Sequence, residues 1–149
     1  MKMPRWLVFD TSVYIAAIRS GPNSPAHLML QDDLPRTYLA SVVAAELRAG
    51  STTESARRAV HEFTGWADRL GRVVTPGASD WERAGDVLGR IRRTEPRLRS
   101  KVPTLWNDVL IALSARQIGA TLVTRNVEDF ELLSRYVRFE LEGQPGSAS

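Results

Sequence analysis

Short apolar segments alternate with longer amphipathic segments along nearly the whole chain, and this alternation limits the fold more than any other feature. Strands are expected at about residues 6–10, 37–40, 72–75, 121–124 and 137–141. Because right-handed crossovers carry the connecting helices over a parallel sheet, helices are expected on both of its faces. The sequence therefore predicts an α/β protein, a three-layer α/β/α sandwich around a mainly parallel sheet of about five strands.

Polar residues mark where the helices between these strands are expected to begin. Thr11 or Ser12 is able to cap the helix after the first strand, and Ser41 is expected to cap the helix after the second. Ser79 opens a segment with the capping-box spacing, and Asn107 is expected to cap the helix before the fourth strand.

The length of 149 residues suits one domain, expected to span residues 1–142 and to be followed by a flexible tail at 143–149. The absence of cysteine excludes a disulfide framework, a thiolate zinc site and a cysteine nucleophile. Four apolar residues before Asp10 are too few for a signal peptide, and no window approaches a membrane span. A cytoplasmic protein without membrane association is expected.

Acidic and polar side chains stand where the expected strands end or where helices begin. Asp10 follows the first strand, Glu46 lies in the helix after the second, and Asp108 lies early in a later helix. Asn126 and Asp129 follow the fourth strand. Each position taken singly is also explained as a helix cap or an exposed acid. Because the carboxyl ends of parallel strands meet at one edge of a sheet, the combination predicts a shared site there.

Convergence of Asp10, Glu46 and Asp108 would create an electrostatic problem that a cation solves. Repulsion and burial raise the pKa of at least one carboxyl group unless a positive charge neutralises the group. Carboxylate oxygens, together with no cysteine and two histidines, favour Mg²⁺ or Mn²⁺ over Zn²⁺. Such a metal lowers the pKa of a bound water and stabilises charge on phosphate oxygens. The chemistry predicted for this site is the hydrolysis of a phosphodiester.

Four segments carry a resemblance to a known family. They are Phe9-Asp10-Thr11-Ser12, Ser41 with Glu46-Leu47, residues 107–112, and Gly119 through Phe130. Together they span residues 6 to about 141 and resemble the PIN-domain ribonucleases, specifically the VapC-type toxins of bacterial and archaeal toxin–antitoxin operons. The main departure is Asn126, where many relatives have an aspartate. Its amide oxygen still accepts a hydrogen bond but adds no charge.

The resemblance implies a Mg²⁺- or Mn²⁺-dependent endoribonuclease that inhibits translation by cutting transfer or ribosomal RNA. Asp10 and Asp108 would hold the main metal, and Glu46 and Asp129 would complete the acidic pocket directly or through water. The full set of implied catalytic residues is Asp10, Ser12, Glu46, Asp108, Thr124, Asn126 and Asp129, with the two hydroxyl groups bonded to phosphate, water or neighbouring carboxylates.

The resemblance also implies partners. A small cognate antitoxin would cover the acidic pocket and insert a basic side chain into it. A homodimer is expected, which would form a heterotetramer or a larger assembly with the antitoxin.

A basic segment at residues 90–101 leads directly to Asp108, and the net charge of +3 favours encounter with polyanions. Such a run is also explained as the solvated end of a helix and the loop after Pro96. Beside a nuclease site, its side chains are expected to contact RNA phosphates, which positions a strand without choosing its sequence. Trp106 is close enough to Asp108 to line a substrate channel. The residues expected to bind RNA are Arg92, Arg93, Arg97, Arg99, Lys101 and Arg125.

Other classes fit less well. An aspartyl-phosphate phosphatase would need a second aspartate two positions after Asp10, where Ser12 stands, and a receiver domain would need an acidic pair earlier than Asp32-Asp33. The rival that stays open is a catalytically weak RNA-binding or partner-binding module with the same fold. Asn126 is compatible with that rival, whereas the four acidic residues argue against it.

Overall fold

A five-stranded parallel sheet forms the centre of this computed structural model, which describes residues 5–144. Its strands lie in the order β3-β2-β1-β4-β5, so the chain builds outward from β1 to β3 and then returns to add β4 and β5 on the other side. The strands are β1 (Leu7–Phe9), β2 (Thr37–Ala40), β3 (Val73–Val74), β4 (Thr121–Thr124) and β5 (Glu140–Gly143).

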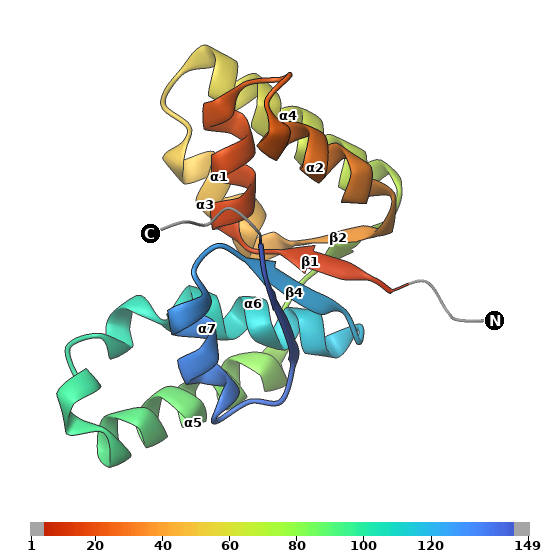
Figure 1. Cartoon of the computed structure of the whole chain (residues 1–149). Coiled ribbons are helices and arrows are strands. Elements are labelled where there is room, and N and C mark those ends of the chain that lie inside the picture. The colour runs from red at the N-terminus through yellow and green to blue at the C-terminus, as the bar shows by residue number, and fades with distance from the viewer. Residues whose placement is uncertain (1–4, 145–149) are drawn as a thin grey trace.

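Helices cover both faces of this sheet (Figure 1). One layer contains α1 (Thr11–Ser20), α2 (Pro25–Asp33), α3 (Ser41–Gly50) and α4 (Glu54–Arg69). The other contains α5 (Ala78–Thr94), α6 (Trp106–Gln117) and α7 (Val127–Ser134). Three 3-10 turns complete the described elements: η1 (Leu34–Arg36), η2 (Pro96–Leu98) and η3 (Val102–Thr104). The predicted three-layer sandwich with a parallel sheet is confirmed.

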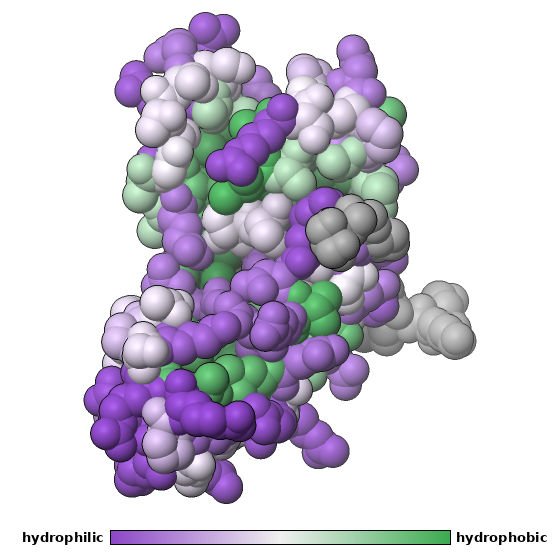
Figure 2. All heavy atoms as spheres, turned by 60° about the vertical axis from the view of Figure 1, so that its left-hand side comes forward, coloured by the Kyte–Doolittle hydropathy of each residue, from purple (hydrophilic) through white to green (hydrophobic). Residues whose placement is uncertain are grey.

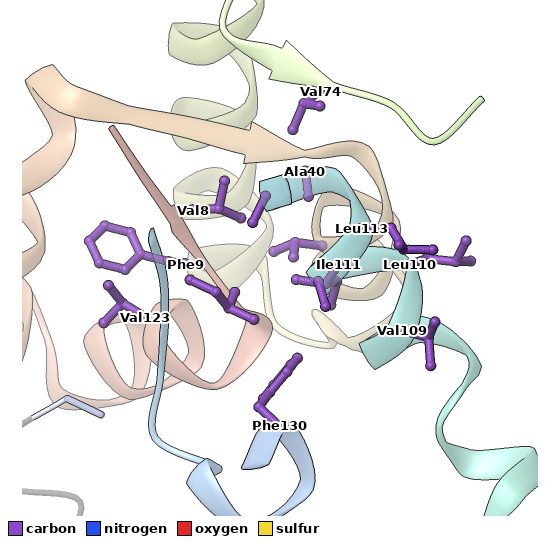
Figure 3. Packing of buried hydrophobic residues seen from close by; sticks show 14 of the residues in the cluster. Val8, Phe9, Ala40, Val74, Val109, Leu110, Ile111, Leu113, Val123 and Phe130 are labelled. Carbon is purple, nitrogen blue, oxygen red and sulfur yellow. The ribbon is translucent and has the colours of Figure 1, made fainter. Parts of the chain in front are cut away.

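The core lies where the central strands meet the two helical layers. Every residue of β1 and β4 is buried, as expected for strands covered on both faces. Figure 3 shows Val8 of β1 on the side of Ile111 of α6, and the Phe9 ring on the other side, beside Val123 of β4. Phe9 packs edge-on against Tyr14 of α1. Residues 109–115 of α6 are all buried, so the middle of this helix is packed in the core, whereas Trp106 and Asn107 at its start are exposed. None of the helices within residues 5–144 is both long and apolar enough to cross a membrane.

The first two predicted helix caps are wrong by one or two residues. Asp10, rather than Thr11 or Ser12, is the N-cap of α1, and Ala40, rather than Ser41, is the N-cap of α3. In both cases the residue before the helix keeps an extended backbone as the strand ends. The hydroxyl residues enter the first helical turn, which leaves the side chains of Thr11 and Ser12 available to the acidic residues described below.

Two further caps differ in the same way. Gly77, not Ser79, precedes α5, and its N–H donates a 2.9 Å hydrogen bond to the Asp80 carboxylate in the first turn. Leu105, not Asn107, precedes α6, because the turn at η3 already has helical backbone angles that lead into that helix.

The C-terminal strand begins and ends later than predicted. β5 pairs with β4 from Glu140 to Gly143, and the N–H of Gln144 donates a 2.7 Å bond to the Thr124 carbonyl. The residues before it turn instead, with Phe139 packed edge-on against Phe130 at 6.4 Å. The expected domain end at 142 is therefore too early, and residues 145–149 of the expected tail lie outside the described part.

Two other strands, β1 and β3, are shorter than predicted at both ends.

Candidate active site

Asp10 lies at the carboxyl end of β1, in the middle of the sheet. Its N–H donates a 3.0 Å bond to the Val123 carbonyl, so pairing with β4 continues past the strand and fixes the residue. Ser12 Oγ donates to one carboxylate oxygen at 2.5 Å, and Thr124 Oγ1 donates to the other at 2.8 Å. Asp10 is only 5% exposed, and this burial raises its pKa, whereas the two hydroxyl bonds act in the opposite direction.

The two hydroxyl groups also accept hydrogen bonds from the loop after β4. The Arg125 N–H donates to Ser12 Oγ at 3.1 Å, and the Asn126 N–H donates to Thr124 Oγ1 at 2.8 Å. Each hydroxyl therefore links that loop to Asp10. Ser12 and Thr124 thus both bond a neighbouring carboxylate in the structure, and these bonds hold residues 10–12 against residues 124–126.

Glu46 comes from the first helical layer, on the half-buried side of α3. Thr11 Oγ1 donates a 2.7 Å hydrogen bond to its Oε1 atom. Because Thr11 directly follows Asp10, this bond brings the glutamate next to the carboxyl end of β1. Sequence reasoning treated Thr11 as a helix cap and missed this contact, although a hydroxyl beside a strand-terminal aspartate was the available signal.

Asp108 comes from the second layer, in the first turn of α6. Its pKa is raised from 3.8 to about 7, chiefly by burial and then by the negative charges of Asp10, Asp129 and Glu46. The charge of Lys101 lowers it in part. Because these charges act on Asp108 through space, the four acidic residues share one electrostatic environment although they come from different elements.

Both oxygens of the Asp129 carboxylate have partners. Lys101 Nζ lies 2.5 Å from Oδ1, and Asn126 Nδ2 donates to Oδ2 at 3.0 Å. Asn126 thus orients Asp129, and Lys101 compensates its charge. Lys101 was expected to contact RNA, whereas in the structure its ammonium group belongs to the acidic site. This contact could not be predicted from the residue pattern, because the path of the loop through η2 and η3 decides it.

The chemistry of these donors fits a hard divalent cation, since all of them are oxygen atoms. Within residues 5–144, however, no three acidic or histidine side chains are arranged as a metal-binding cluster. The carboxylates instead bind hydroxyl groups, the Asn126 amide and the Lys101 ammonium, and the raised pKa of Asp108 favours its protonated form. The acidic residues therefore converge without forming a ready-made cage.

Four of the predicted RNA-binding arginines lie at the end of α5 and around η2. Arg92 and Arg93 occupy the last turn of α5, and Arg97 and Arg99 follow in and after η2; all four are exposed. A groove of about 550 Å³ lies between this segment and α7, and its lining includes Arg97, Lys101, Asp129 and Arg135. The groove therefore opens beside the acidic residues.

Arg125, the remaining predicted RNA-binding residue, lies differently. Its guanidinium group donates a 3.1 Å hydrogen bond to Gln144 Oε1, next to the end of β5. Sequence reasoning missed Gln144 because it assigned this buried residue to the tail.

The carboxyl end of β1 points to the left in Figure 1, and Figure 2 turns that side of the molecule forward. Polar side chains cross the middle of this face, with apolar patches above and below them.

These observations define a class: a parallel α/β domain with an acidic site at the carboxyl ends of its central strands, where the strand order reverses between β1 and β4. The family model described as the PIN domain matches residues 7–135. The chain therefore belongs to the PIN domain family, as its motifs indicated. No curated protein matches the chain.

Solved structures with the same fold come from several bacteria. A chain of DNA-bound VapBC from Salmonella typhimurium is 22% identical, with a TM-score of 0.65, over 94% of this chain and 98% of that one. A chain of VapBC2 from Rickettsia felis bound to a promoter DNA fragment is 24% identical, with a TM-score of 0.56, over 93% of this chain and 98% of that one. A chain of FitAcB from Neisseria gonorrhoeae is 22% identical, with a TM-score of 0.58, over 91% of this chain and 95% of that one. At these identities the likeness shows the shared fold.

Proposed function

We propose that this chain is a Mg²⁺- or Mn²⁺-dependent endoribonuclease, the toxin of a toxin–antitoxin pair, which inhibits translation by cutting transfer or ribosomal RNA. The observation that carries the proposal is the effect of Asp10, Glu46 and Asp129 on the pKa of Asp108. Acidic side chains from four separate elements are gathered at one edge of the sheet at an electrostatic cost. Nuclease activity would explain why the fold holds these acids together, and membership of the PIN domain family supports that explanation.

Asp10 and Asp108 would hold the metal, with Glu46 and Asp129 completing the pocket directly or through water. When bound, the metal would supply an activated water and stabilise charge on the phosphate oxygens. The hydroxyl bonds from Ser12 and Thr124 favour the ionised form of Asp10 and fix the direction of its carboxylate.

The basic residues near the groove between η2 and α7 would hold the RNA backbone. Arg97 lines this groove, and Arg92, Arg93 and Arg99 are exposed in the same segment, where they would reach phosphates. Arg125 would approach the strand from the other end of the acidic loop. Contacts of this kind position RNA without reading its bases.

An antitoxin is the expected partner, and the VapBC and FitAcB structures with the same fold support that expectation. A basic side chain of the antitoxin would supply a positive charge beside Asp108 and Asp129. We further propose a homodimer, which would assemble with the antitoxin as a heterotetramer or larger, and action in the cytoplasm as a single nuclease domain.

A second candidate is an RNA-binding or partner-binding module with the PIN fold and little or no turnover. Two observations favour it: the neutral Asn126 at the end of β4, and the Lys101 ammonium that already binds Asp129. Both reduce the negative charge available to a cation.

Total RNA incubated with the wild type, Asp10→Asn and Asp108→Asn separates the two candidates. The nuclease predicts new RNA ends with Mg²⁺, no cleavage with EDTA, and no cleavage by either variant. Asp68→Asn, which removes the same charge from an exposed position on α4, is the matched control and keeps activity. Cleavage that survives EDTA and both substitutions would contradict the proposal. RNA that is bound without new ends would support the binding module.

A further inference from the structure

Two exposed tryptophans lie next to the acidic site. Trp81 is 53% exposed in the first turn of α5, and Trp106 is 39% exposed at the start of α6, two residues before Asp108. Their ring centroids are 6.4 Å apart with an angle of 34° between the planes. Within the described part of the chain, they are the aromatic members of the set of exposed large hydrophobic residues. Exposed indole rings of this size usually have a partner to cover them.

Trp81 forms part of the wall of a groove of about 440 Å³ between α3 and α6. Apolar side chains such as Val42 and Leu110 line most of it, and Ser41 and Asn107 contribute polar atoms. Glu46 also lines this groove, so it reaches the acidic site. An apolar hollow with a few polar groups is the usual form of a site for a flat organic ring.

Trp106 is held in place by the helix beside it. A Cβ atom added at Gly85 of α5 would be in ordinary contact with the Trp106 ring, at 3.7 Å, so the ring lies over a position of the helix that has no side chain. The ring is thus supported on one side and exposed on the other. An aromatic surface held in this way loses little conformational freedom when a ligand stacks on it.

The two grooves beside the acidic residues differ in charge. The groove on the Asp129 side has a charged lining of both signs, with Arg97, Lys101 and Arg135 beside Glu95, Glu128, Asp129 and Glu131. Among the described residues that line the groove on the Glu46 side, Glu46 alone carries a charge, and most of the wall is apolar. A single RNA strand that crosses the acidic site would therefore meet charged side chains on one flank and, apart from Glu46, an aromatic and apolar wall on the other.

We propose that Trp81 and Trp106 form a stacking platform for one unpaired nucleobase next to the phosphate that is cut. Ser41 and Asn107 supply hydrogen-bonding groups to the edge of that base, since hydroxyl and amide groups both donate and accept. The proposal rests on the proposed function, because RNA is taken as the ligand. It adds a specific contact to that function: one base beside the cleaved phosphate leaves its own stack and rests on the two indole rings.

The test measures RNA binding without chemistry. The wild-type protein in EDTA is titrated with a fluorescently labelled, single-stranded oligoribonucleotide of mixed sequence, and binding is followed by anisotropy. Tryptophan emission is recorded in the same titration with unlabelled RNA. Stacking predicts quenching of that emission, and Trp81→Leu and Trp106→Leu each weaken binding by about tenfold or more. Trp81→Phe and Trp106→Phe, which keep an aromatic face, retain most of the affinity.

Leu70→Ala is the control, because it removes exposed apolar surface from the loop after α4, outside this groove, and leaves affinity unchanged. Circular dichroism verifies that each variant is folded. The same RNA annealed to its complement binds wild type and leucine variants equally, since its bases are already stacked. Equal single-strand affinity of wild type and both leucine variants would overturn the proposal. A changed molar mass in light scattering with unchanged RNA affinity would also overturn it and assign the groove to a contact between copies.

The outcomes separate the platform from the nuclease. Single-strand binding with quenching, in a protein that does not cut RNA, supports the platform and contradicts the nuclease. Cleavage of RNA by a protein whose leucine variants bind the single strand as tightly as the wild type supports the nuclease and overturns the platform.

Discussion

The Thr124 hydroxyl donates a 2.8 Å hydrogen bond to Asp10, a residue 114 positions earlier in the chain. The bond joins the carboxyl ends of two neighbouring strands, and both residues are buried. The same hydroxyl accepts from the Asn126 N–H, so it also starts the acidic loop. One side chain thus contributes both to the stability of the sheet edge and to the form of the site.

Replacing Thr124 with valine removes this donor and keeps the shape of the side chain. The carboxylate of Asp10 is then left buried with one bond fewer, which costs about 1–3 kcal/mol in the free energy of unfolding. Urea denaturation followed by circular dichroism measures the loss. Thr124→Ser, which keeps the hydroxyl and loses a methyl group, is the control. A valine variant as stable as the serine variant would show that the hydrogen bond contributes nothing.

Asp108 gives the metal-free protein a particular dependence on pH. Its pKa is 3.8 when unfolded and about 7 when folded, so between these values the folded state binds more protons. The contribution of Asp108 to stability is therefore full below about pH 4 and is lost as the pH rises through about 7. Asp108→Asn lacks this loss, and its stability relative to the wild type increases from pH 5 to pH 8. Urea midpoints in EDTA at both pH values test this, and parallel curves would contradict it.

Lys101 is expected to compete with a divalent cation for the acidic residues. Its ammonium group lies against Asp129 and lowers the pKa of Asp108, as a bound cation would. Lys101→Met removes that charge, so Mn²⁺ binds more tightly in the variant, by a few-fold or more, in isothermal titration calorimetry. Arg99→Met, an equal loss of charge from an exposed position two residues earlier, changes the affinity less. Equal affinities in the two variants would mean that Lys101 acts only through the net charge.

The exposed arginines near η2 are expected to contact RNA phosphates. Each contact that is lost reduces the slope of log K against log salt concentration by about 0.7 for a single strand. Arg97→Gln with Arg99→Gln therefore weakens binding at low salt and flattens the slope by up to about 1.4. The control pair is Arg57→Gln with Arg58→Gln on α4, where both side chains are more than half exposed. Anisotropy titrations at several salt concentrations measure both, and identical slopes would place the RNA elsewhere.

The sheet was predictable because its strands are short, apolar and separated by helical patterns. Residues 37–40 and 121–124 were predicted to the residue, since turn and cap signals border them closely. β5 was shifted because the packing of Phe139 on Phe130, which is set by tertiary contacts, decides where pairing with β4 begins. The cap of α1 was misplaced because the Thr11 hydroxyl bonds Glu46 of α3 and the Ser12 hydroxyl bonds the Asp10 carboxylate, rather than the backbone at the start of the helix.

The convergence of the acidic residues was predictable in part, and their partners were not. Asp10, Asp108 and Asp129 follow strands or open helices, and a parallel sheet brings such positions to one edge. The contact between Lys101 and Asp129 depends on the path of the loop through η2 and η3, which has no periodic pattern to read. Among the described residues, no three acidic or histidine side chains form a metal-binding cluster, and the carboxylates bind hydroxyl, amide and ammonium groups instead.

The origin of Glu46 in one helical layer and of Asp108 and Asp129 in the other has a consequence for biosynthesis. A nascent chain that has emerged only as far as α4 contains Asp10 and Glu46 but neither of the other two acids. It follows that any activity depending on all four arises only after the last third of the polypeptide has docked. Truncated or half-folded chains would therefore lack that activity, because the helices that carry Asp108 and Asp129 would not yet be in place.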